Sequence, residues 1–77
     1  MFRTLVKSDA VTVDNRNLTV RYFEVRTERG LKRYSAEILI GPGDHIILDD
    51  DSIVRLEARA ARLVPATLYS RMLARTA

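Results

Sequence analysis

The chain has no cysteine, no tryptophan and one histidine among its 77 residues. Without cysteine it can form neither a disulfide bond nor a thiolate zinc site, and His45 alone cannot supply a cluster of imidazole ligands. The core of so short a chain rarely contributes more than about 3 to 5 kcal/mol of stability, and small domains commonly gain more from disulfides, a metal or another subunit. The composition therefore favours self-association, and we expect a homo-oligomer or a protein partner.

Long apolar runs and linkers are also missing. No stretch approaches the roughly 20 apolar residues that cross a bilayer, and residues 1–7 lack the basic and apolar pattern of a secretion signal. The chain has only two prolines and three glycines, and it contains no repeat or low-complexity segment that would mark a boundary. We expect a single domain over residues 1–77, without a membrane segment and in the cytoplasm.

The charges are unevenly distributed along the chain. Residues 1–43 carry eight Lys and Arg against five Asp and Glu, residues 44–51 carry four Asp and no base, and residues 52–77 carry five Arg against one Glu. These segments have net charges of +3, −4 and +4, which sum to the overall +3. A basic tail after an acidic segment can indicate an anionic partner.

The first 48 residues have the pattern of β-strands. Runs with high β propensity alternate with turn-forming residues, and the strand candidates are Phe2–Lys7, Ala10–Val13, Leu18–Thr27, Tyr34–Ile40 and His45–Leu48. From Ile53 onward the apolar spacing becomes helical. The sequence therefore predicts an α+β domain, with an antiparallel meander sheet of four to five strands followed by a C-terminal helix.

Two features bound the helical segment. Three residues before it, Asp50, Asp51 and Ser52, are candidates for its N-cap, and acids there suit the positive end of the helix dipole. Pro65 disfavours helical geometry at the residue before it, so the helix is expected to be kinked or broken at this point. The apolar residues expected to cover the sheet are Ile53, Leu56, Ala60 and Leu63.

The hairpin formed by the strand candidates Leu18–Thr27 and Tyr34–Ile40 has two possible registers. A two-residue turn at residues 29–30 places Phe23 opposite Ala36, which makes one side of the hairpin apolar. A three-residue loop over residues 28–30 places Phe23 opposite Ser35 and wastes this cross-strand pair. We expect the first register, with the helix covering the face that carries Phe23, Val25, Tyr34, Ala36 and Ile38.

The apolar positions change phase within the strand that begins at Leu18. Leu18, Val20 and Tyr22 alternate on one face of the strand, whereas Phe23 and Val25 alternate on the other. A β-bulge near Tyr22 would return both sets to the same face. Alternatively, both faces are covered in part of this strand, for instance by a partner.

Residues that could support catalysis occur in contexts typical of structural roles. The run of aspartates at 49–51 lacks the alternate spacing, the glycine and the distal glutamate of a calcium loop, so helix capping is the better interpretation. His45 has no nucleophile in a recognisable motif. The segment 41–43 lacks the lysine of a phosphate loop and is interpreted as a turn. We expect no enzymatic activity, metal, cofactor or small-molecule substrate.

Arginines recur at helical spacing in the C-terminal segment. Arg55, Arg59 and Arg62 share one helix face, because they span only about 60° around the axis. Guanidinium groups arranged in this way can bind successive phosphates. Three further candidates for contact with an anion or nucleic acid lie in the central hairpin: Arg21, Arg26 and Arg33. The alternative is a solvated face on which the arginines pair with acids.

A second apolar stripe follows Pro65 at helical spacing, and its residues are Leu68, Tyr69, Met72 and Leu73. The stripe can pack on the sheet of its own chain or bind another subunit. Because the core is small, we interpret these four residues as candidate partner-binding residues.

Taken together, the sequence favours a noncatalytic interaction module that self-associates, with nucleic-acid binding through the arginines as the alternative. A structural observation distinguishes the two. Arginines of the helix that are contiguous with those of the hairpin would favour nucleic acid. Exposure of the apolar stripe after Pro65 would favour an oligomer or a protein partner.

Overall fold

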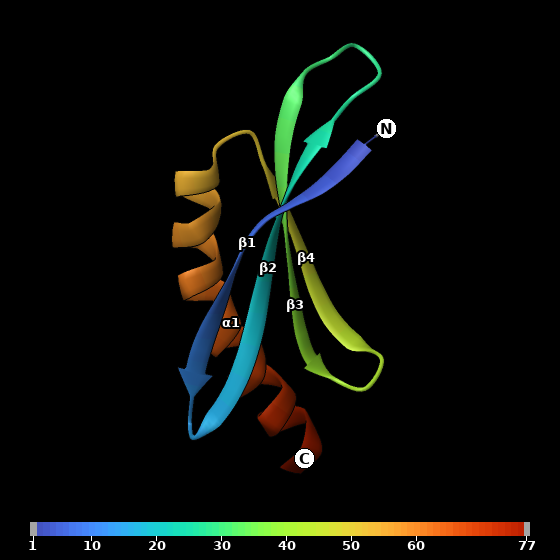
Figure 1. The fold of residues 1–77 in the computed structure, drawn as a ribbon. Helices are drawn as coiled ribbons and strands as arrows, with labels where there is room; N and C mark the ends of the chain where they lie inside the picture. The colour runs from blue at the N-terminus through green and yellow to red at the C-terminus, as the bar shows by residue number, and fades with distance from the viewer. Residues whose placement is uncertain (1, 77) are drawn as a thin grey trace.

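The computed structural model describes residues 2–76 of the chain and the side chains of residues 2–74. Its elements are β1 (Phe2–Val13), β2 (Arg16–Arg26), β3 (Lys32–Gly41), β4 (Asp44–Asp50) and α1 (Ile53–Thr76). The four strands form one antiparallel sheet in chain order, and α1 lies along one face of it (Figure 1). The predicted α+β meander followed by a C-terminal helix is confirmed, with four strands.

The first hairpin joins β1 to β2 through Asp14 and Asn15, which have φ angles of 48° and 64°. Two successive left-handed residues suit a two-residue hairpin turn, and Asp and Asn tolerate this conformation better than other side chains do. β1 is one strand where two were expected, and its pairing with β2 shifts between Leu5 and Lys7. The irregularity therefore lies in β1, opposite the position near Tyr22 where a bulge in β2 was expected.

The loop between β2 and β3 has three residues, Glu28–Gly30. It is closed by Thr27 and Leu31, with the backbone N–H of Thr27 donating to the carbonyl oxygen of Leu31 at 3.0 Å. Gly30 has a φ of 80°, as the third position of such a loop requires. A two-residue turn of the favoured type would need left-handed backbone at position 29 as well. That position is occupied by arginine, which adopts this conformation much less readily than glycine does.

Because the loop has three residues, the observed register differs from the expected register by one residue. Phe23 lies opposite Ser35, and Tyr22 lies opposite Ala36. Because neighbouring residues of a strand point to opposite faces, Phe23 and Val25 lie on the side of the sheet away from α1, contrary to expectation. The face beneath the helix instead continues Leu18, Val20 and Tyr22 along β2.

The core lies between one face of the sheet and α1. The sheet contributes seven buried apolar residues, Leu18, Val20, Tyr22, Ala36, Ile38, Ile40 and Leu48, and the helix contributes Leu56, Ala60, Val64 and Leu68. The buried helical residues are four positions apart in the sequence. Four residues rotate by about 40° more than one full turn, so the buried stripe winds around the helix as it crosses the sheet. It winds away from Leu63, which is 38% exposed, so the expectation that Leu63 covers the sheet is wrong.

Helix α1 continues from Ile53 to Thr76 with Pro65 inside it, so the expected break does not occur and a kink remains a prediction. Proline in a helix interior removes one backbone hydrogen bond and usually destabilises the helix. Val64 and Leu68 are both buried against the sheet. Their packing on either side of Pro65 offsets that cost and holds the helix together.

We predict that Ile38→Val destabilises the domain by about 0.5 to 1.5 kcal/mol, because Ile38 is fully buried at the centre of the core. The control is Val54→Ala, a larger truncation at a residue that is 73% exposed on α1 and away from both faces of the sheet. Urea denaturation should show a clear decrease in the free energy of unfolding for the first variant only. Equal losses would contradict this placement of the core.

Candidate functional site

The face of the sheet that points away from α1 is covered by no element within residues 2–76, and we call it the open face (Figure 1). Strand pairing fixes its composition, because side chains alternate between the two faces of each strand. Its residues include Arg3, Leu5 and Ser8 from β1; Thr19, Arg21, Phe23 and Val25 from β2; Arg33, Ser35, Glu37 and Leu39 from β3; and His45, Ile47 and Asp49 from β4.

Large apolar side chains lie uncovered on the open face. Leu5, Leu39 and Ile47 are 52%, 54% and 58% exposed, and Phe23 and Val25 are partly buried. An antiparallel sheet with one face in water normally places polar residues on that face. Single exposed apolar residues are common on protein surfaces, but these five come from all four strands of one sheet. We call these five residues the apolar patch, although Arg21 and Glu37 lie among them. Exposed apolar side chains gathered on one face are typical of interaction surfaces.

The middle of the open face carries opposite charges on its two inner strands. Arg21, at the centre of β2, lies opposite Glu37 on β3, and Ser8 and Ile47 occupy the two ends of the same row. Glu37 is bound by Arg3, whose guanidinium group donates a hydrogen bond to Oε2. Arg21 makes no ion pair with any side chain of residues 2–74.

Beside this charged row the open face is hollowed. The hollow has a volume of about 430 Å³, and its walls are Asn17, Leu18, Thr19, Arg21, Glu37, Ile38, Leu39 and His45. On the other side of the row, the guanidinium carbon of Arg3 lies 3.7 Å from the ring centroid of Phe23, a cation–π contact. The open face thus combines an open depression, a partly shielded aromatic ring and a charged centre.

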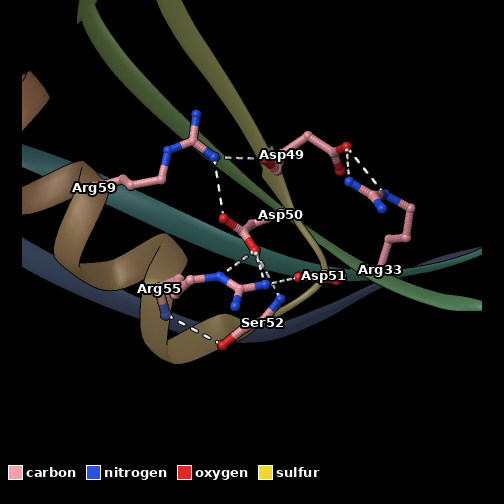
Figure 2. A network of polar contacts seen from close by, with 7 residues as sticks. All are labelled: Arg33, Asp49, Asp50, Asp51, Ser52, Arg55 and Arg59. Carbon is pink, nitrogen blue, oxygen red and sulfur yellow. Dashed lines mark hydrogen bonds and ion pairs between the residues drawn. The ribbon is translucent and has the colours of Figure 1, made fainter.

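The acidic residues at 49–51 join the end of β4 to the start of α1 (Figure 2). Asp50 Oδ1 accepts hydrogen bonds from the backbone N–H of Ser52 at 3.0 Å and from Nε of Arg55 at 3.2 Å. Its Oδ2 accepts one from Nη1 of Arg59 at 3.2 Å. Ser52 Oγ accepts one from the backbone N–H of Arg55 at 3.3 Å, which identifies Ser52 as the N-cap of α1.

The neighbouring aspartates extend this junction onto the sheet. Asp49 Oδ2 accepts hydrogen bonds from Nε and Nη2 of Arg33 at 3.1 and 2.8 Å, and the backbone carbonyl of Asp49 accepts one from Nη1 of Arg59 at 2.7 Å (Figure 2). Asp51 pairs with Arg55 on the first turn of the helix. The aspartates therefore serve as partners for arginines of the same chain.

The pKa of Asp50 is held well below its usual range. The backbone N–H of Ser52 has the largest effect, and the guanidinium groups of Arg55 and Arg59 lower the pKa further, while desolvation opposes them. The side chain is only 12% exposed, so these donors replace much of the water that would otherwise solvate it. The ionised carboxylate links the helix start to the sheet.

Three of the six candidate arginines are engaged at this junction. Arg33, Arg55 and Arg59 all bind the segment 49–51, so their charges are largely matched by carboxylates (Figure 2). This arrangement corresponds to the expected alternative in which the arginines pair with acids. It differs from the clustered basic surface that nucleic-acid binding usually requires.

The other three candidate arginines lie apart from the junction and from one another. Arg21 is in the middle of the open face, Arg26 is near the hairpin loop, where its Nε lies 3.5 Å from Oε1 of Glu24, and Arg62 is exposed on α1. Arg62 makes no ion pair within the described side chains. The structure therefore does not bring the six residues together on one surface.

The candidate partner-binding stripe divides into one buried and three exposed residues. Leu68 is 3% exposed and belongs to the core of its own chain. Tyr69, Met72 and Leu73 are 64%, 47% and 53% exposed on the last turns of α1. The stripe is therefore narrower than expected, because packing on the sheet uses its first residue.

The apolar patch of the open face was not among the candidate sites predicted from the sequence. One signal was the change of apolar phase at Phe23 and Val25. The second of its two interpretations was that part of this strand is covered on both faces. Another lies in two uninterrupted apolar runs, 38–40 and 46–48. An unbroken run is typical of a strand with apolar side chains on both faces.

Comparison of the chain with protein-family models, curated proteins and solved structures finds no match. In the described part of the chain, no helix is both long and apolar enough to cross a membrane. The same part contains no group of three or more His, Asp or Glu side chains placed to hold a metal ion.

We predict that Asp50→Asn destabilises the fold more than its matched control Asp51→Asn. Asp50 accepts hydrogen bonds from three residues and is 12% exposed. Among the side chains of residues 2–74, Asp51 forms an ion pair only with Arg55, and it is 62% exposed. Thermal unfolding at neutral pH should show the larger decrease in melting temperature for Asp50→Asn.

The same variant tests the depressed pKa of Asp50. A carboxyl whose pKa is lower in the folded than in the unfolded state adds stability that is complete above the unfolded value of about 3.9 and is lost as the pH falls through the folded value. The melting temperature of Asp50→Asn should therefore decrease less between neutral and acidic pH than that of the wild type. Parallel pH profiles would show that Asp50 makes no such contribution.

Proposed function

We propose that this protein is a noncatalytic interaction module that self-associates through the open face of its sheet. The observation that carries the proposal is the exposure of Leu5, Leu39 and Ile47 on a sheet whose other face is fully occupied by the core. Covering this patch would remove apolar surface from water, which is the main driving force of most protein association.

The size of the domain supports a second subunit. One helix and one sheet face supply the core of this 77-residue chain. A domain of this size commonly needs a further source of stability. A sheet that is apolar on both faces is normally covered on both faces. A second copy on the open face would give four layers, helix, sheet, sheet and helix, in which both faces of each sheet are buried.

The charges of the open face also favour a protein partner. Two of its three arginines, Arg3 and Arg33, bind the acidic side chains Glu37 and Asp49 on the same face. The surface is thus nearly neutral and alternates in sign. A surface of mixed sign complements another protein better than it complements the uniformly negative backbone of a nucleic acid.

We predict that Ile47→Glu weakens self-association on the order of 100-fold, because it would place an unpaired charge in the buried interface. The matched control is Val54→Glu, since Val54 is 73% exposed on α1, away from the open face. Sedimentation velocity over a range of protein concentrations compares the two variants with the wild type. A wild-type protein that remains monomeric at high micromolar concentration would overturn the proposed function.

A further inference from the structure

We propose, resting on the proposed function, that the second copy sits face to face on the open face and is related to the first by a twofold axis between β2 and β3. Arg21 of each copy then pairs with Glu37 of the other. The partner is thus a second copy of this chain in one defined register.

The axis follows from the sheet topology. In a four-stranded sheet in chain order, β2 and β3 are the two inner strands. We place the twofold axis between two stacked sheets, parallel to the strands and along the β2–β3 boundary. This axis puts β2 of one copy over β3 of the other, with the same position along the strand direction. Residues that are cross-strand partners within one chain therefore become facing residues between the two chains, as in any self-complementary twofold interface.

The charges match at the centre of this arrangement. Arg21 and Glu37 are cross-strand partners in the middle row of the sheet, so the axis brings each Arg21 over the Glu37 of the second copy. Within its own chain Glu37 is bound by Arg3 through Oε2, which leaves Oε1 to accept a further hydrogen bond. Arg21 makes no ion pair among residues 2–74 and is available to donate it.

The sizes of the facing side chains match as well. Phe23 and Ser35 are cross-strand partners, so the ring of Phe23 in one copy faces the small Ser35 of the other. Ile47 and Ser8 lie at opposite ends of the middle row, so each Ile47 faces a Ser8. Large side chains placed over small ones can interdigitate across the roughly 10 Å that separates stacked sheets.

The hollow of the open face receives another large side chain, that of Leu39. If the register of Val20 and Ile38 is continued by one residue, Leu39 faces Thr19 of the second copy. Thr19 is one of the residues that line the hollow of about 430 Å³. Leu39 is 54% exposed and forms part of the wall of this depression in its own chain. The twofold arrangement thus inserts each Leu39 into the hollow of the opposite copy.

The test exchanges the two central charges. Arg21→Glu places like charges at both central contacts, and Glu37→Arg does the same with the opposite sign. Each variant alone should dimerise on the order of 100-fold more weakly than the wild type, because like charges then face each other in the interface. An equimolar mixture should restore a mixed dimer of near wild-type affinity, since both contacts again join opposite charges.

Native mass spectrometry with one variant carrying a mass tag identifies the mixed dimer directly, and sedimentation equilibrium gives the dissociation constants. The matched control is Arg62→Glu, the same substitution at an exposed arginine of α1 that makes no ion pair within the described side chains. This variant should dimerise as the wild type does. Circular dichroism establishes that each variant is folded.

The double variant, with Arg21→Glu and Glu37→Arg in one chain, keeps the test decisive if a single variant fails to fold. It should be folded and dimeric, and a folded monomer would overturn the arrangement. Folded single variants that remain dimeric, or that stay monomeric when mixed, would overturn the pairing of Arg21 with Glu37 while leaving self-association through the open face intact. A monomeric wild type would instead overturn the proposed function on which this arrangement rests.

Discussion

The pairing register between β2 and β3 is the constraint on which the rest of the structure depends. Gly30, with its left-handed backbone, allows a three-residue loop, and that loop places Tyr22 opposite Ala36. A shift of one residue would exchange the two faces of the strand. The register therefore decides at once which side chains form the core beneath α1 and which form the open face with Phe23.

The sequence predicts the class of fold and the local signals but not this register. The strand runs, the N-cap and the change to helical spacing at Ile53 are local features. They are found where the sequence indicates them, except that the first two strand runs form the single strand β1; the N-cap is Ser52, one of three candidates. The register depends on the backbone conformation of one loop, in which the left-handed Gly30 suits three residues and not two. The expected choice favoured cross-strand apolar pairs on one face, and it failed because this sheet is apolar on both faces, as Phe23 and Leu39 show.

The arginines show a similar limit of sequence patterns. Helical spacing correctly places Arg55 and Arg59 on one side of α1, but spacing cannot reveal that the acidic segment at 49–51 folds back beside them. The −4 charge of residues 44–51 and the +4 charge of residues 52–77 therefore partly match each other within the chain. An uneven charge distribution along a sequence is evidence for an external partner only where the fold keeps the opposite charges apart.

Among the surfaces of this molecule, the open face is better suited to association than the edges of the sheet or the end of the helix. The edge strand β1 contains a bulge next to Lys7, and the other edge strand, β4, begins and ends with aspartates. Bulges and charged residues at an edge discourage strand pairing between molecules. The stripe at the end of α1 loses Leu68 to the core. The open face alone combines apolar side chains from every strand with opposite charges on adjacent inner strands, and a twofold axis between these strands converts each cross-strand neighbour into an intermolecular partner.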